Sequence, residues 1–167
     1  MTSWKVMVLF IATLSAGTVV GLEADRNQPI TIQADDAMLD ERQGTSIYRG
    51  DVTIDQGTLH ISADEVEVIS DGDKIIQIIA TGKADTGSLA HYEQKPEEKE
   101  DLVKADAHKI TWFVQEERLH LVGDARLVQA QDTFSGQLLY YNVNEGIVSL
   151  SGGAQKDRVI MTINPKN

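Results

Sequence analysis

The stretch Val52-Thr53-Ile54-Asp55-Gln56-Gly57-Thr58-Leu59-His60-Ile61-Ser62-Ala63-Asp64 decides the fold. Apolar and polar residues alternate on both sides of its Gln56-Gly57 pair. A period of two is typical of a strand with one buried face, and a glycine-containing pair between two such runs is typical of a hairpin turn. The stretch therefore predicts a β-hairpin with one aliphatic face.

The end of this stretch belongs to a pattern that occurs four times. Each copy begins with four residues in the order apolar, any residue, small and polar. Farther along the chain, each copy has a glycine that lies two positions before a small or apolar residue. The copies begin at Ile32, Ile61, Val103 and, in weaker form, Phe134, and the glycines are Gly50, Gly82, Gly123 and Gly152. The spacing is about 30 residues, with one longer interval of about 40. Such repeats predict stacked β-hairpins that share one apolar inner surface.

Turn signals continue along the chain at Gln43-Gly44, Asp71-Gly72, Thr86-Gly87 and Asn144-Glu145-Gly146. Each lies between alternating runs, as the turns of a β sandwich or jelly roll do. The longest interruption, His91 to Asp101, contains a proline and a dense run of charges. We interpret it as a solvated loop inserted into a hairpin; a functional charged lobe is the alternative.

Composition excludes several classes of protein. The net charge of −11 argues against a nucleic-acid partner, because binding to phosphates needs clustered Lys and Arg. It also argues against electrostatic docking on an anionic membrane. Apolar residues make up 41% of the chain but aromatic ones only 5%, so the core is aliphatic. The chain has no cysteine, which excludes disulfides and thiolate metal sites.

Residues 1–21 are typical of a secretory signal peptide. Lys5 provides a basic start, Val6 to Val20 is mostly apolar, and Val19 and Gly21 suit cleavage before Leu22. The apolar run of about 15 residues is shorter than the roughly 20 that span a bilayer, which disfavours an uncleaved anchor. We therefore expect export to the periplasm and a single mature domain, residues 22–167. Its net charge is one unit more negative, −11 − 1 = −12, because Lys5 is the only charge removed.

Catalytic motifs are absent from the sequence. There is no phosphate-binding glycine loop, nucleophile elbow or paired-histidine zinc motif. The four histidines are scattered, and adjacent carboxylates such as Glu116-Glu117 would point to opposite faces of a strand. Asp35, Asp64 and Asp106 occupy equivalent repeat positions, which indicates a turn or strand-end role. We predict no enzyme activity, no metal site and no cofactor.

The predicted inner face is the remaining candidate site. Its lipid-binding candidates share an inward position in the alternating runs: Ile30, Ile32, Ile54, Ile61, Val68, Ile78, Trp112, Val114, Leu121, Phe134 and Leu138, with Tyr140 continuing the face. They form either a filled core or an open trough for an apolar ligand. The residues alone do not decide between these two interpretations. Alternation from Ile30 to Ile163 leaves no capping unit, and uncapped strand edges recruit another chain.

Two runs give the chain a specific resemblance. Gln28-Pro29-Ile30-Thr31-Ile32-Gln33-Ala34-Asp35 and the run from Tyr48 to Asp64 are similar to the LptA (OstA) family of periplasmic lipopolysaccharide-transport bridge proteins. The resemblance extends over nearly all of residues 22–163. It implies an open, twisted β jelly roll of roughly sixteen antiparallel strands. It further implies head-to-tail stacking into a homo-oligomer and a trough that shields the acyl chains of lipid A.

The resemblance also implies partner sites at both ends. The first strand, with Ile30, Thr31, Ile32 and Gln33, corresponds to the family's contact with the inner-membrane protein LptC. The last runs correspond to its contact with the next copy or with the N-terminal domain of LptD; their candidate residues are Ile147, Val148, Leu150, Ile160, Met161 and Ile163. A structural β filament in the periplasm and a carbohydrate-binding β stack are the alternatives. A membrane-anchored partner that keeps residues 1–21 is another.

Overall fold

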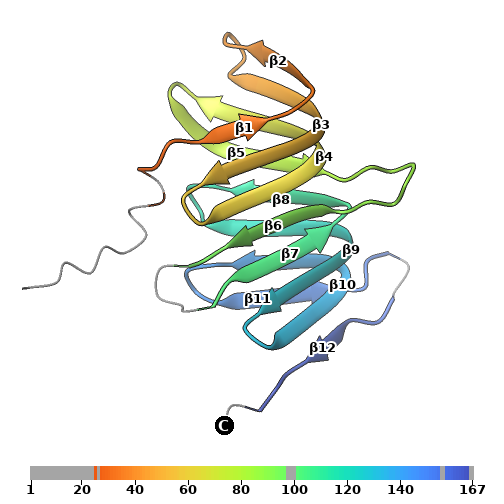
Figure 1. Ribbon diagram of the computed structural model, residues 1–167. Helices are drawn as coiled ribbons and strands as arrows, with labels where there is room; N and C mark the ends of the chain where they lie inside the picture. Colours follow the sequence, from red (N-terminus) through yellow and green to blue (C-terminus); the bar gives the residue numbers. More distant parts are fainter. Residues whose placement is uncertain (1–24, 26, 97–100, 155–156, 166–167) are drawn as a thin grey trace, which may run out of the picture.

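The computed structural model describes residues 25, 27–96, 101–154 and 157–165, so the expected signal peptide lies outside the described residues. The described chain forms twelve strands, all paired antiparallel. They are β1 (Thr31–Gln33), β2 (Asp36–Asp40), β3 (Thr45–Gln56), β4 (Leu59–Asp71), β5 (Lys74–Thr81), β6 (Ala90–Gln94), β7 (Val103–Ala107), β8 (Lys109–Phe113), β9 (Arg118–Gln129), β10 (Asp132–Asn142), β11 (Ile147–Ser151) and β12 (Ile160–Thr162). Figure 1 shows them piled from β2 at the top to β12 at the bottom.

The stack consists of two sheets that share four long strands, β3, β4, β9 and β10. The first sheet runs in the order β1, β3, β4, β6, β7, β9, β10, β12 and contains residues 52–56, 59–63, 125–129 and 132–136 of the long strands. The second runs β2, β3, β4, β5, β8, β9, β10, β11 and contains their other halves. Twelve strands, four of them counted in both sheets, give sixteen strand segments. The predicted antiparallel jelly roll is therefore confirmed.

The two sheets meet along a line that we call the bend. Gly50 in β3 and Gly123 in β9 lie on it with φ values of 79° and 78°, and each is followed by an aspartate with positive φ. Few residues other than glycine adopt this conformation without strain. Gly82 N–H donates to the carbonyl of His108, and His108 N–H donates to that of Gly123, so hydrogen bonds continue along the bend. The repeated glycines of the sequence therefore mark places where the chain changes sheet.

We predict that Gly123→Ala destabilises the fold more than Gly72→Ala. Both glycines have positive φ, 78° and 57°, which costs a residue with a Cβ about 1–2 kcal/mol. A Cβ on Gly123 would also lie 2.8 Å from His108 Cδ2, whereas one on Gly72 would have no atom within 4 Å. Urea unfolding of both variants measures the difference. Equal losses of unfolding free energy in the two variants would show that the close approach between position 123 and His108 does not affect stability.

The interior between the sheets is mainly aliphatic, as predicted, with three aromatic residues, Tyr92, Trp112 and Tyr141. Its buried apolar residues are Val52, Ile54, Leu59, Ile61, Val66, Val68, Ile78, Ala80, Ala90, Tyr92, Val103, Ala105, Ala107, Ile110, Trp112, Leu119, Leu121, Ala125, Leu127, Leu139, Tyr141 and Val143. The predicted glycine turns are also confirmed, because Gly44, Gly57, Gly72, Gly87 and Gly146 all have positive φ.

Two predictions about local structure are wrong. His91–Gln94 is not part of a loop but belongs to β6, where Tyr92 is fully buried. Its alternation was hidden by the polar residues around a single tyrosine. Leu138 and Tyr140 do not face the interior, because the register of β10 shifts between Gly136 and Leu138 and exchanges the two faces. Leu139 and Tyr141 are the inward residues instead.

Candidate functional site

The interior forms one apolar surface along the whole stack. Six of the predicted lipid-binding residues lie in it with at most 5% of their surface exposed: Ile54, Ile61, Val68, Ile78, Trp112 and Leu121. Ile32, Val114 and Phe134 are partly buried and pack against this core, and Ile30 is exposed just before β1. At the middle, the rings of Tyr92 and Trp112 lie 5.5 Å apart. Nine of the eleven candidates therefore lie in the interior or pack against it, and Ile30 and Leu138 do not.

Among the described residues, the backbone closes only the bend side of the stack. Four of the described connections between the sheets are the long strands, and three are the links β1–β2, β5–β6 and β7–β8, all at the bend. The described ends of the β11–β12 link also lie there, since Ser151 pairs with Leu138 and Ile160 with Ser135. On the opposite side, each described turn joins two strands of the same sheet. The sheets can therefore separate there without breaking a strand pair. We call this the open side.

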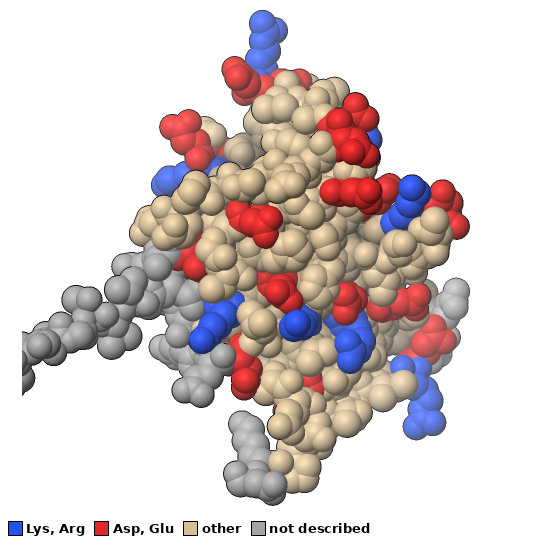
Figure 2. All heavy atoms as spheres, viewed as in Figure 1, with Lys and Arg blue, Asp and Glu red and all other residues tan. Residues whose placement is uncertain are grey.

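The two ends of the stack are strand edges with exposed apolar side chains. Within the described residues, β1 and β2 pair only with β3, and β11 and β12 pair only with β10. Eight of the eleven exposed large apolar residues lie on or beside these four strands: Ile30, Met38, Leu39, Ile147, Val159, Ile160, Met161 and Ile163. In Figure 2 the lower end of the molecule, where Figure 1 places β12, is mostly tan. Unpaired apolar edges are templates for another strand.

The structure refines the predicted edge residues. Ile147, Ile160, Met161 and Ile163 are more than half exposed. Val148 and Leu150 instead pack against the interior, because they pair with the inward residues Tyr141 and Leu139. Met38 and Leu39 of β2 were missed, since residues 36–40 lack a clear alternation in the sequence. Thus each end presents two strands, one from each sheet.

A ladder of charged side chains crosses the outer face of the first sheet. His60 Nδ1 lies 2.7 Å from Asp55 Oδ1, and His91 Nδ1 lies 2.7 Å from Asp106 Oδ1. Lys104 Nζ lies 3.1 Å from Glu93 Oε2. Opposite charges at cross-strand positions stabilise a sheet modestly. Red and blue side chains are interleaved on the face shown in Figure 2. The sequence did not reveal this ladder, because it depends on the register between distant strands.

Two histidines give opposite dependences of stability on pH. The hydrogen bond to Asp106 raises the pKa of His91, whereas burial and then nearby Arg118 lower the pKa of His120. The stability that His91 contributes is therefore fully present below its pKa in the unfolded chain, about 6.5, and is lost as pH rises through its pKa in the folded protein. The neutral form of His120 is favoured in the fold, so its contribution is present above that pKa and lost as pH falls.

We predict that His91→Gln costs more stability at pH 5 than at pH 9. His120→Gln should show the reverse, with its larger cost at pH 9. Urea unfolding of the two variants and the wild-type protein at both pH values measures this. The same pH trend in both variants would contradict the assigned environments.

Neither a metal centre nor a spanning helix is found in the described part of the chain. No group of three or more His, Asp or Glu side chains there is arranged to hold a metal ion. Residues 25, 27–96, 101–154 and 157–165 include no helix long and apolar enough to cross a membrane.

Comparison with known proteins identifies the family. The profile described as "LptA/(LptD N-terminal domain) LPS transport protein" matches residues 31–147. The chain belongs to this family. The resemblance drawn from the two N-terminal runs is thereby confirmed. The match runs from β1 to the start of β11, so it includes the bend and most of the interior surface.

Individual members of the LptA family align over most of the chain. The lipopolysaccharide export system protein LptH of Pseudomonas aeruginosa is 35% identical over 161 residues, covering 93% of this chain and 90% of LptH. LptA of Haemophilus influenzae is 27% identical, covering 95% and 91%. LptA of Escherichia coli K12 is 28% identical, covering 82% and 70%.

A solved structure of the family has the same fold. The crystal structure of P. aeruginosa LptH, described as the LptA-homologous periplasmic component of the lipopolysaccharide transport device, superposes with a TM-score of 0.73. The superposition covers 85% of this chain and 99% of that one, at 35% sequence identity.

Proposed function

We propose that this protein is a periplasmic lipopolysaccharide-transport protein whose interior shields the acyl chains of lipid A between the inner and outer membranes. One observation carries the proposal: in the described residues, a continuous apolar interior is closed at the bend, has no backbone crossing its open side, and ends at both ends in strands whose outer edges are unpaired. Membership of a lipopolysaccharide-transport family supports it. The protein acts by binding, without a catalytic step.

The energetics suit transfer rather than tight storage. Burying one methylene contributes about 0.8 kcal/mol, so an acyl chain of about a dozen carbons could contribute several kcal/mol. Ile61, Trp112 and Leu121 are buried among other side chains, so an entering acyl chain must replace contacts between side chains. The net free energy of lipid binding is thereby reduced. Because the next copy offers a similar surface, the free energy of the lipid is nearly the same in successive copies. The energy for directional movement then comes from a partner.

The head group stays outside, beyond the open side. The mature chain, with a net charge of −11 − 1 = −12, repels phosphate groups, and salt screens this repulsion over about 10 Å. Recognition therefore depends mainly on the acyl chains. The proposed lipid contacts are the inward residues Ile32, Ile54, Ile61, Val68, Ile78, Trp112, Val114, Leu121 and Phe134, with Ile30 at the first edge.

The strand edges are proposed as the bridge contacts. In a head-to-tail homo-oligomer, β11 and β12 of one copy pair with β2 and β1 of the next, which extends both sheets across the joint. Exposed apolar residues at each edge would be covered in such a joint. At the ends of the bridge, the β1 edge meets LptC and the β12 edge meets the N-terminal domain of LptD.

Export and processing complete the proposal. Residues 1–21 direct the chain to the periplasm and are removed near Gly21, leaving a single domain of residues 22–167. The placement of Asp25 supports a boundary before this residue. Asp25 is buried, and its carboxylate accepts a hydrogen bond of 2.5 Å from the hydroxyl of Thr58 in the β3–β4 turn.

The test compares two ligands by native mass spectrometry. One is lipopolysaccharide, and the other is the same molecule with its acyl chains removed by hydrolysis. Binding of the intact form only supports the proposal. Equal binding of both forms would favour a carbohydrate-binding β stack, and binding of neither would favour a structural filament.

A further inference from the structure

The bend contains two equivalent corners. At the first, Gly50 and Asp51 have φ values of 79° and 42°; at the second, Gly123 and Asp124 have 78° and 48°. A Cβ on Gly50 would meet the side chain of Asp35, and one on Gly123 would meet that of His108. The neighbouring long strand changes sheet at Asp64 in the first corner and at Gln137 in the second. The two corners therefore share a backbone but differ in side chains.

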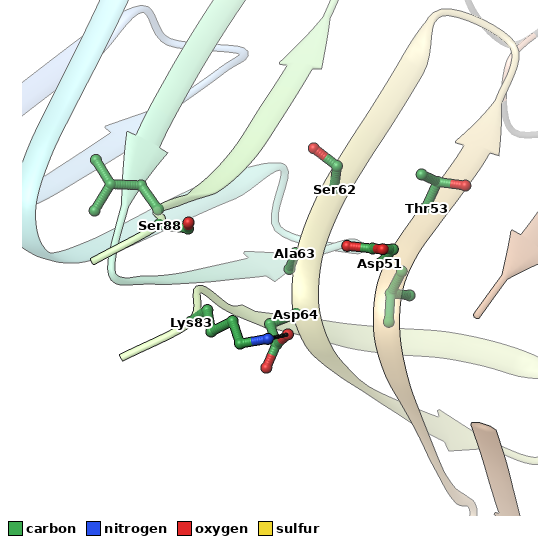
Figure 3. Close-up of a pocket in the computed structure, with 9 residues that line it drawn as sticks. Asp51, Thr53, Ser62, Ala63, Asp64, Lys83 and Ser88 are labelled. Atoms are coloured by element: carbon green, nitrogen blue, oxygen red, sulfur yellow. Dashed lines mark ion pairs between the residues drawn. The ribbon is translucent and has the colours of Figure 1, made fainter. Parts of the chain in front are cut away.

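Each corner has a cavity on its outer side. The first, of about 340 Å³, is lined by residues 51–53 of β3 and 62–64 of β4, together with Lys83, Ser88 and Leu89 (Figure 3). The second, of about 300 Å³, is lined by residues 124–126 of β9 and 135–137 of β10, together with Arg158. Strand pairing is the same in both, since Thr53 pairs with Ser62 and Arg126 pairs with Ser135.

The charges of the two cavities are opposite. In the first, Asp51 and Asp64 face one cation, Lys83, whose Nζ lies 3.8 Å from Asp64 Oδ1. The second has Arg126 and Arg158 with one carboxylate, Asp124. That carboxylate already accepts from His108 Nε2 at 3.0 Å and from Gln137 Nε2 at 3.4 Å. The second cavity is thus cationic on a strongly acidic protein.

Both guanidinium groups are available to a ligand. Arg126 lies on the outer face, because its neighbours Ala125 and Leu127 are buried, and its ion pair with Asp106 is long at 4.0 Å. Arg158 is exposed and makes no ion pair within the described part of the chain. Guanidinium forks bind phosphate through two parallel hydrogen bonds, and a serine hydroxyl can donate a third.

We propose that the cavity formed by Asp124, Arg126, Ser135, Gln137 and Arg158 binds a phosphate-type oxyanion. It lies at the bend, on the outer surface of the first sheet, and is separate from the interior and from the open side. The proposal therefore goes beyond acyl-chain transport and does not depend on it. Free inorganic phosphate and a phosphorylated lipopolysaccharide head group both present the required chemistry.

The test is a titration followed by amide chemical shifts of Gly136 and Gln137. Three probes are used: inorganic phosphate, lipopolysaccharide, and lipopolysaccharide from which the phosphates have been removed. Arg126→Thr gives the second cavity the residue that the first cavity has at the equivalent position, Thr53. Arg158→Ser removes the other arginine of the second cavity. Arg49→Gln, which removes an arginine paired with Glu65 outside the cavity, is the matched control.

Saturable shifts are expected in the wild-type protein and in Arg49→Gln, with affinity at least about tenfold weaker in Arg126→Thr and Arg158→Ser. Shifts with inorganic phosphate identify a free anion, and shifts with only the phosphorylated lipopolysaccharide identify a head group. The unchanged remainder of the spectrum reports that each variant is folded. Absence of saturable shifts with both inorganic phosphate and phosphorylated lipopolysaccharide would overturn the proposal. Equal shifts with the dephosphorylated lipopolysaccharide, or shifts that both arginine variants retain, would overturn it as well. Neither result would affect binding of acyl chains in the interior.

Discussion

Ile160→Asp is expected to abolish head-to-tail assembly while the monomer stays folded. Ile160 lies on the edge strand β12 and is 64% exposed, so the monomer tolerates a carboxylate there. In the proposed joint the same carboxylate would be taken from water without a paired cation, which is strongly unfavourable. Sedimentation velocity over a range of protein concentrations measures the loss of oligomers.

Leu102→Asp is the matched control for this prediction. Leu102 is also an exposed apolar residue, at 39%, but it lies before β7 and away from both edges. Its variant should assemble as the wild-type protein does. If Ile160→Asp also assembled normally, β12 would not form the joint.

Trp112→Ala is expected to lower the free energy of unfolding by about 3–5 kcal/mol, because a large buried aromatic side chain is lost. Trp112 is 5% exposed and packs on the ring of Tyr92 between the two sheets. This is a large share of the roughly 5–15 kcal/mol that stabilises a typical domain. Urea unfolding monitored by circular dichroism measures the loss.

Tyr140→Ala serves as the comparison for the interior variant. Tyr140 is 44% exposed and stacks on His120 at 4.3 Å on the outer face of the second sheet. We expect this change to cost less than about 1.5 kcal/mol. Similar losses from the two variants would mean that Trp112 is not part of a close-packed interior.

Period-two patterns predicted the strands that the structure confirms most clearly. Val52 to Asp64 forms the β3–β4 hairpin as expected, because each run has aliphatic residues on one face and a glycine turn between them. The repeated glycines also predicted periodic structural markers. That they form a single bend could not be read from the sequence, because a long alternating run gives no sign that its two halves pair in different sheets.

The errors have equally local causes. In β10 the bend shifts the register after Gly136, so alternation counted across it assigned Leu138 and Tyr140 to the wrong face. In β6 the strand is short and mostly polar outside Tyr92. The charge ladder and the cationic cavity combine residues from strands far apart in the sequence, such as Arg126 and Arg158. Such combinations follow from sheet order, which a pattern of single residues does not specify.

Photo-crosslinking in living cells tests the central claim most directly. A photoreactive aromatic amino acid is placed at position 112 in the interior and, as a control, at position 140 on the outer face. The proposed transport function predicts a lipopolysaccharide adduct from position 112 and none from position 140. Folded, exported protein that gives no adduct at position 112, or an equal adduct at both positions, would contradict an interior path for the acyl chains.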